Sequence, residues 1–179
     1  LTSLQADPAG VDIHIEAGSP ALRLIEICDD HRPDLIVMRA HQKYRIVDRI
    51  IGSTTDRMIA AGQVPVLVVK RRVGKPYARV VLATDGRDDA SSALSFVAGL
   101  LPGARLHLVQ AVHVAPQLEE AMLRAGTDQS ALAAHREALE RRAGDHLRAL
   151  AATVRPRATT RVLRGVPPEV LAHATRSSN

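Results

Sequence analysis

The chain has 179 residues, 46% of them hydrophobic, which is enough to bury the core of one large domain or most of two ordinary ones. Its net charge is +5, but aromatic residues make up only 2%, so a base-stacking platform is hardly available and specific nucleic-acid binding is not expected. No apolar stretch is long enough to span a membrane, no signal peptide is recognisable, and the single cysteine excludes an internal disulfide framework. We therefore expect a soluble, cytoplasmic protein.

Apolar runs of strand length alternate with segments of helical period, and this pattern predicts an α/β fold with a parallel sheet covered by helices. Residues 11–16 alternate apolar and polar side chains, as a strand would. A helix follows, with an apolar face made of Ala21, Leu24, Ile25 and Cys28. Cys28 is therefore expected in the core rather than as a reactive thiol. Branched apolar runs at residues 34–38 and 64–69 predict two strands buried on both faces.

Between these two strands lies a predicted loop, residues 39–49, followed by a helix. Ser53 is a candidate N-cap with Asp56 as its partner, and Gly62 is a suitable residue to end this helix. Residues 71–76 are basic and contain glycine and proline, which is typical of a linker.

A second unit is predicted to begin with a strand at residues 79–85, buried on both faces, and a turn at Gly86. Asp88 or Asp89 is then expected to cap a helix with an apolar face of Ala90, Leu94, Val97 and Leu101. The predicted elements that follow are a strand at 106–114, a loop through Gly126, a long helix with Leu132, Leu139, Ala143, Leu147, Leu150 and Val154 inward, a strand at 159–163 and a helix at 168–175.

An internal repeat relates the two units, because a glycine turn followed by proline and leucine recurs at a constant offset of 147 residues (18 to 165, 20 to 167 and 24 to 171). Each copy is predicted to be a strand, a glycine turn and a helix. The repeat divides the chain into residues 1–71 as the second half of one domain, residues 72–76 as a linker and residues 77–179 as the first part of another domain. Both units are expected to be incomplete domains.

Four motifs in this order resemble the universal stress protein family. They are Asp34-Leu35-Ile36-Val37-Met38, Gly52-Ser53-Thr54, Pro65-Val66-Leu67-Val68-Val69 and Ala83-Thr84-Asp85-Gly86. The resemblance covers nearly the whole chain. It implies a doubly wound, mostly parallel sheet of the adenine nucleotide α-hydrolase-like type, present here as two partial repeats.

Nucleotide-binding members of the family resemble one another in a motif of two glycines separated by two residues, followed after nine further residues by Gly-Ser or Gly-Thr. Gly52-Ser53 matches the last element, but the two earlier positions hold Arg39 and Gln42, whose side chains would crowd a phosphate. The helix start at Gly52, Ser53 and Thr54 can still bind an anion, and Arg39 or Lys43 can supply charge. Ser53 is alternatively an ordinary N-cap.

Asp85 matches the family's acidic residue at the end of the opening strand, near the nucleoside part of the site. Two interpretations of Asp85 stay open, a ligand contact and a cap of the turn at Gly86. Asp85 and Ser53 belong to different units, so they would share a site only if the two halves packed as a composite.

The leading hypothesis is a universal stress response protein that binds ATP, a related adenine nucleotide or another anion as a regulatory ligand and is not an enzyme. One alternative is a stress protein without nucleotide, acting as a dimerising interaction module through the edge strand at residues 65–69. The other is a slow nucleotide hydrolase, supported by fold analogy alone. The histidine and cysteine spacings do not suggest a metal site, and no nucleophile motif is present. The expected partner is a second copy, or a pseudo-dimer of the repeats.

Overall fold

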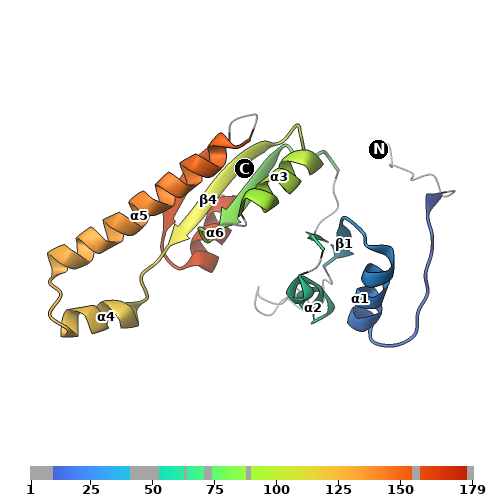
Figure 1. The fold of residues 1–179 in the computed structure, drawn as a ribbon, viewed down its shortest axis with the longest axis horizontal. Helices are drawn as coiled ribbons and strands as arrows, with labels where there is room; N and C mark the ends of the chain where they lie inside the picture. Colours follow the sequence, from blue (N-terminus) through green and yellow to red (C-terminus); the bar gives the residue numbers. More distant parts are fainter. Residues whose placement is uncertain are drawn as a thin grey trace. The chain divides into compact units, whose positions relative to one another are not determined.

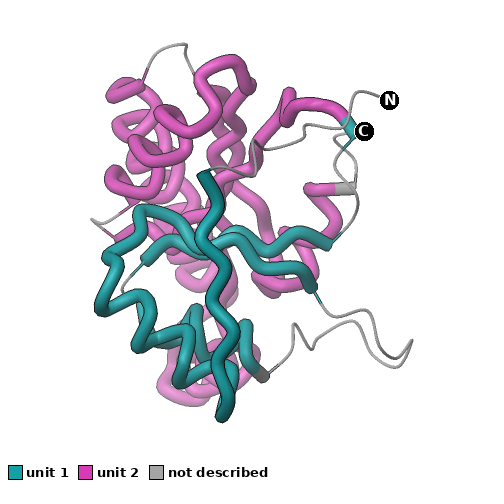
Figure 2. Tube along the Cα trace, turned by 90° about the vertical axis from the view of Figure 1, so that its right-hand side faces the viewer, with its two compact units in different colours: residues 1–74 teal, residues 75–179 magenta. Residues whose placement is uncertain are grey.

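The computed structural model describes residues 10–40, 53–62, 64–70, 74–87, 90–154 and 158–176. They fall into two compact units, unit 1 up to Gly74 and unit 2 from Lys75 onward (Figure 2). No helix in the described ranges is long and apolar enough to cross a membrane.

Unit 1 contains α1 (Pro20–His31), β1 (Ile36–Arg39), α2 (Ser53–Ala61) and β2 (Val66–Val69) (Figure 1). β1 and β2 pair in parallel, with Ile36 opposite Val66 and Arg39 opposite Val69. The apolar face predicted for the first helix is confirmed, because Ala21 and Cys28 are buried. Burial raises the pKa of the Cys28 thiol, and the charge of Asp29 raises it further by a smaller amount. The raised pKa keeps the thiol protonated and unreactive.

Two expectations for unit 1 are wrong. Residues 11–16 form no strand, and Val11, Ile13 and Ile15 are 54%, 81% and 92% exposed. Alternation alone does not make a strand, since the backbone also needs a neighbouring strand for its hydrogen bonds, and no described strand pairs with these residues. β1 is not buried on both faces either, because Val37 is 60% exposed. β2 falls short of the same expectation, since all four of its residues are only half-buried.

Unit 2 contains a three-stranded parallel sheet in the order β3-β4-β5. Its elements are β3 (Arg79–Thr84), α3 (Ala90–Leu100), β4 (Arg105–Val112), α4 (Pro116–Arg124), α5 (Gln129–Ala152), β5 (Thr159–Arg164) and α6 (Pro167–Arg176). The predicted strands and the long helix are confirmed, and α5 runs along β4 in Figure 1. The aspartates expected to cap α3, Asp88 and Asp89, lie outside the described residues.

The two faces of this sheet bury separate apolar clusters. On one face, Leu82, Leu106 and Leu108 of the strands pack against α3 and α5, where Leu94 and Leu147 are fully buried. On the other face, Val109 and Leu163 pack against Ala174 of α6. The prediction that β3 is buried on both faces therefore holds in its middle, where Leu82 and Val81 belong to opposite clusters, but fails at the exposed Ala83.

The helices of unit 2 cover both faces of its sheet. α3 and α5 connect β3 to β4 and β4 to β5 along one face, whereas α6 leaves β5 along the other face and contacts β4 as well. Unit 2 is therefore an α/β arrangement with a parallel sheet between two layers of helices.

The loop predicted from the end of the strand through Gly126 is wrong over most of its length, because Pro116–Arg124 forms α4. Pro116 occupies the first turn of α4, where the missing N–H of proline costs nothing. No residue of α4 is buried, and only a short helical pattern marks this helix in the sequence. α5 then begins with an N-cap, since Asp128 Oδ1 accepts a hydrogen bond of 2.7 Å from the Ala131 N–H. This bond, together with one from Ser130, lowers the pKa of Asp128.

Candidate functional site

A cleft of about 300 Å³ lies at the carboxyl ends of β3 and β4, the end of the sheet at which open α/β folds bind ligands. We call it the Asp85 cleft. β3 contributes Asp85 and Gly86, which follow its last residue, and β4 contributes its final residues from Gln110 on. The polar side chains that line the cleft are those of Asp85, Gln110, His113, Arg142 and His146. α5 forms the remaining wall, to which it contributes the apolar side chains of Leu139 and Ala143 beside those of Arg142 and His146.

The turn after β3 fixes the position of Asp85. Gly86 has a φ of +87°, a conformation that side chains rarely adopt, and its N–H donates to Thr84 Oγ1 over 3.0 Å. Asp85 Oδ1 accepts a hydrogen bond of 3.1 Å from the Arg87 N–H, and Oδ2 lies 3.1 Å from the Arg87 guanidinium. Asp85 therefore stabilises the turn, and it does so with its carboxylate exposed at the rim of the cleft.

Two buried polar atoms in this cleft have no hydrogen-bond partner, Gln110 Oε1 and His146 Nε2. They are the only such side-chain atoms found in the described residues. Leaving a buried polar atom without a partner costs about 1–3 kcal/mol. Both atoms belong to side chains that line the Asp85 cleft, but the atoms themselves are closed to solvent.

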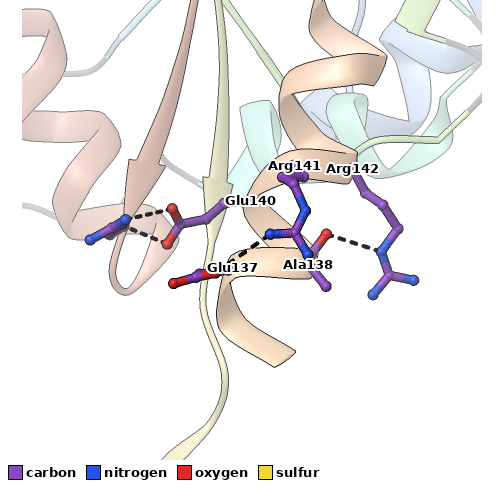
Figure 3. A network of polar contacts seen from close by, with 6 residues as sticks. Glu137, Ala138, Glu140, Arg141 and Arg142 are labelled. Carbon is purple, nitrogen blue, oxygen red and sulfur yellow. Dashed lines mark hydrogen bonds and ion pairs between the residues drawn. The ribbon is translucent and has the colours of Figure 1, made fainter. Parts of the chain in front are cut away.

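Arg142 gives the cleft a positive charge. Its Nε donates to the Ala138 carbonyl over 3.3 Å, and no carboxylate of the described residues pairs with it. Its neighbours on α5 are engaged elsewhere, as Figure 3 shows, because Arg141 lies 3.5 Å from Glu137 and Glu140 binds a guanidinium with both oxygens. Arg142 is therefore the guanidinium available to an anionic ligand in this cleft.

A second cleft, of about 280 Å³, lies at the carboxyl ends of β4 and β5 and shares Val112 and His113 with the first. Its two arginines are neutralised, Arg136 by Glu119 at 2.6 Å and Arg164 by Glu140 at 2.6 Å. The hydrogen bond and charge of Glu140 also raise the pKa of Arg164. Because these charges cancel, the second cleft attracts an anion less than the Asp85 cleft does.

Of the residues predicted for the site, only Asp85 lines the cleft. The other polar residues there include Gln110, Arg142 and His146, which were not predicted from the sequence. Gln110 could have been noticed as a polar residue near the end of an apolar strand. Arg39, the exposed last residue of β1, and Thr54, half-buried in α2, belong to unit 1. Gly52, Gln42 and Lys43 lie outside the described residues. Ser53 begins α2, but its side chain is outside them as well.

Metal binding finds no support in the part of the chain that the structure describes, because no three His, Cys, Asp or Glu residues gather there. The polar groups of the Asp85 cleft suit an organic ligand with hydrogen-bond donors and negative charge. Unit 2 is thus an α/β module with a polar cleft at the carboxyl ends of its parallel strands.

Comparison with known proteins identifies the family. The model of the universal stress protein family matches residues 1–70 and 76–179, so the chain belongs to this family. Among curated proteins, universal stress protein MJ0577 of Methanocaldococcus jannaschii is 36% identical over 58 residues, which cover 32% of this chain and 36% of that protein. Universal stress protein MJ0531 of the same organism is 38% identical over 68 residues, or 37% and 40% of the two chains. Each match thus spans well under half of the curated relative.

Proposed function

We propose that this universal stress protein binds an adenine nucleotide such as ATP in the Asp85 cleft as a regulatory ligand. The observation that carries the proposal is the cleft at the carboxyl ends of β3 and β4, whose lining combines Asp85, Gln110 and Arg142. Arg142 supplies a charge for a phosphate, and Asp85 supplies an acceptor for a ribose hydroxyl.

Regulatory binding fits the lining of this cleft better than turnover. The side chains that line it include no serine, threonine, cysteine or lysine that could act as a nucleophile. We therefore propose a protein that senses its ligand rather than an enzyme. The alternative is a slow nucleotide hydrolase, because Asp85, His113 and His146 can position a water molecule. Release of phosphate from ATP would reveal this activity.

For unit 1 we propose anion binding at the start of α2, with Gly52, Ser53, Thr54 and Arg39 as the contacts. A helix N-terminus attracts anions through its free N–H groups and its dipole. Arg39 and Gln42 stand where nucleotide-binding relatives have glycine, so a full nucleotide should bind unit 1 weakly. The regulatory nucleotide site is therefore assigned to unit 2.

We also propose that the chain has tandem organisation, with residues 1–71 corresponding to the second half of a family domain, 72–76 to a linker and 77–179 to the first part of another domain. The turns before α1 and α6 support this, because Gly18 and Gly165 have φ values of 127° and 126°. The helices begin at Pro20 and Pro167, at the same offset. The family model also matches in two separate segments.

A second candidate role is that of an interaction module that pairs with another copy through β2. β2 is entirely apolar, only half-buried, and has a strand neighbour on one side only in the described residues. The unpaired backbone N–H and C=O groups of such an edge strand can form hydrogen bonds with another strand. Light scattering at micromolar concentration tests this role, since a monomeric mass would rule it out.

Isothermal titration calorimetry of the full chain with ATP tests the nucleotide proposal. Arg142→Gln removes the charge and should weaken ATP binding about tenfold, the worth of one charge-assisted hydrogen bond. Arg141→Gln, on the neighbouring position that pairs with Glu137, is the matched control and should bind as the unmodified protein does. Absence of ATP binding at millimolar concentration would contradict the proposal, and phosphate release would favour the hydrolase.

A further inference from the structure

We propose that the outer edge of β5, together with the groove beside it, binds an extended segment of a partner protein in which a carboxylate and an apolar side chain are separated by one residue. This inference does not depend on the nucleotide proposal, because it concerns another part of unit 2. The sheet order β3-β4-β5 places β5 at the edge, and β4 is its one strand neighbour in the described part of the chain. We call this surface the β5 edge; it includes Arg161, Leu163, Val170, His173 and Ala174.

The backbone of β5 is the first reason. An edge strand presents a row of N–H and C=O groups that its own sheet does not pair. Among the described residues, backbone hydrogen bonds to residues 159–164 come from β4 alone. An extended peptide can therefore join the sheet along β5 through main-chain hydrogen bonds, which is a recurring mode of peptide recognition.

The groove beside this strand is the second reason. It has a volume of about 340 Å³ and is lined by residues of β5 and α6. Leu163, Val170 and Ala174 give it an apolar wall, and these three residues belong to the cluster on the α6 face of the sheet. An apolar side chain on an added strand would extend this cluster, because side chains on the same face of neighbouring strands pack against each other.

Arg161 supplies the charge that selects the partner. It lies opposite Val109 in the register of β4 and β5, and Val109 belongs to the same cluster as Leu163. Arg161 and Leu163 are therefore on one face of the sheet, as alternate residues of a strand must be. Arg161 is exposed, and no acidic side chain lines the groove. Arg164, by contrast, is already neutralised by Glu140.

The same charge argues against a second copy of the chain as the occupant. If two β5 edges paired with each other, the arginines of one chain would lie close to those of the other, and like charges on paired strands repel. A strand with a carboxylate opposite Arg161 and an apolar residue opposite Leu163 fits instead. Its acidic and apolar residues must be separated by one residue, because alternate side chains share a face.

Fluorescence anisotropy of two labelled peptides with the full chain tests this spacing. Both are blocked, threonine-rich peptides of identical composition with one glutamate and two isoleucines. In the first, one residue separates the glutamate from each isoleucine, so the peptide fits β5 in either direction; in the second, the isoleucines adjoin the glutamate. The first peptide should bind about fivefold more tightly, because the second cannot place both groups on the Arg161 face.

A charge exchange at Arg161 identifies the contact. Arg161→Glu should weaken binding of the first peptide about fivefold or more. The same variant should bind a version with lysine in place of the glutamate better than the unmodified protein does. Arg161 is exposed, so its replacement should leave the fold intact. Arg124→Glu, the same change at an exposed position of α4 outside the groove, is the matched control and should keep the original preference.

Hydrogen exchange of the full chain, with and without the first peptide, identifies the strand that the peptide joins. Added protection in β5 supports the inference. Protection added elsewhere, equal binding of the two peptides, or no binding at millimolar concentration would overturn it. A dimeric mass in light scattering that the peptide converts to a monomeric one would also overturn it, because a second copy would then occupy the β5 edge.

Discussion

Replacing Gly165 with alanine should destabilise the protein far more than replacing Gly18 with alanine, although the two glycines share one backbone conformation. Their φ values are 126° and 127°, and each precedes a helix that starts with proline. Their surroundings differ. A Cβ at residue 165 would lie 2.8 Å from Val170 Cγ1, whereas at residue 18 the nearest atom is Arg23 Nε at 3.5 Å, an ordinary contact.

The size of the difference follows from these contacts. At Gly165 a backbone strain of about 1–3 kcal/mol adds to overpacking of about 1–3 kcal/mol, because Val170 is stiff at its branched Cβ and packs in the cluster under α6. The Gly165 N–H is also fixed, since it donates to the Val112 carbonyl over 3.1 Å. At Gly18 only the strain applies, and the exposed residues before it can relax. We expect a loss of about 2–6 kcal/mol for Gly165→Ala and, because the exposed segment before it relaxes, about 1 kcal/mol or less for Gly18→Ala.

Urea unfolding followed by circular dichroism measures both losses, and hydrogen exchange assigns them to a unit. Protection should fall in α6 and its strand neighbours for Gly165→Ala, and in α1 alone for Gly18→Ala. Equal losses for the two variants would refute the argument, because it attributes the difference to Val170. Gly165→Ala combined with Val170→Ala should recover part of the lost stability, since it removes the clashing methyl groups.

Three further predictions concern unit 2. Leu108→Ala should cost about 2–5 kcal/mol because the side chain is fully buried, whereas Leu118→Ala on the exposed surface of α4 should cost less than about 0.5 kcal/mol in the same urea titration. Asp128→Ala should lower the thermal midpoint at pH 7. The native pKa of Asp128 lies below the unfolded value of about 3.8, so its contribution is present above that value and is lost as the pH falls through the native pKa. The midpoints of Asp128→Ala and the unmodified protein should therefore converge in acid, and a constant difference would contradict this. ATP affinity should fall with added salt in the unmodified protein and less steeply in Arg142→Gln, and identical slopes would exclude Arg142 as a phosphate contact.

Most of the fold could be predicted from the sequence because local pattern and packing agree there. The apolar positions of α5 recur with helical period, and Leu132, Ala143, Leu147 and Leu150 are indeed buried. The alternation at residues 11–16 led to a wrong strand prediction. A strand forms only where another strand pairs with it, and the sequence of one segment does not reveal that partner. α4 was missed because its residues bury nothing and it is held from outside, by the ion pair of Glu119 with Arg136.

The candidate site was predictable only in part. Asp85 could be found because a carboxylate directly after an apolar strand, followed by glycine, is a local signal. Gln110, Arg142 and His146 lie between 25 and 61 positions further along the chain and carry no motif of their own. They join Asp85 because β4 lies next to β3 in the sheet and α5 covers the same face. That proximity is a property of the fold rather than of any one segment.

The most direct test of nucleotide binding in the Asp85 cleft is an NMR titration of the isotopically labelled full chain with ATP. We predict that the largest shift changes fall on the backbone amide of Gly86, the side-chain amide of Gln110 and the ring of His146. Changes confined to the start of α2, or no changes at millimolar ATP, would contradict the account.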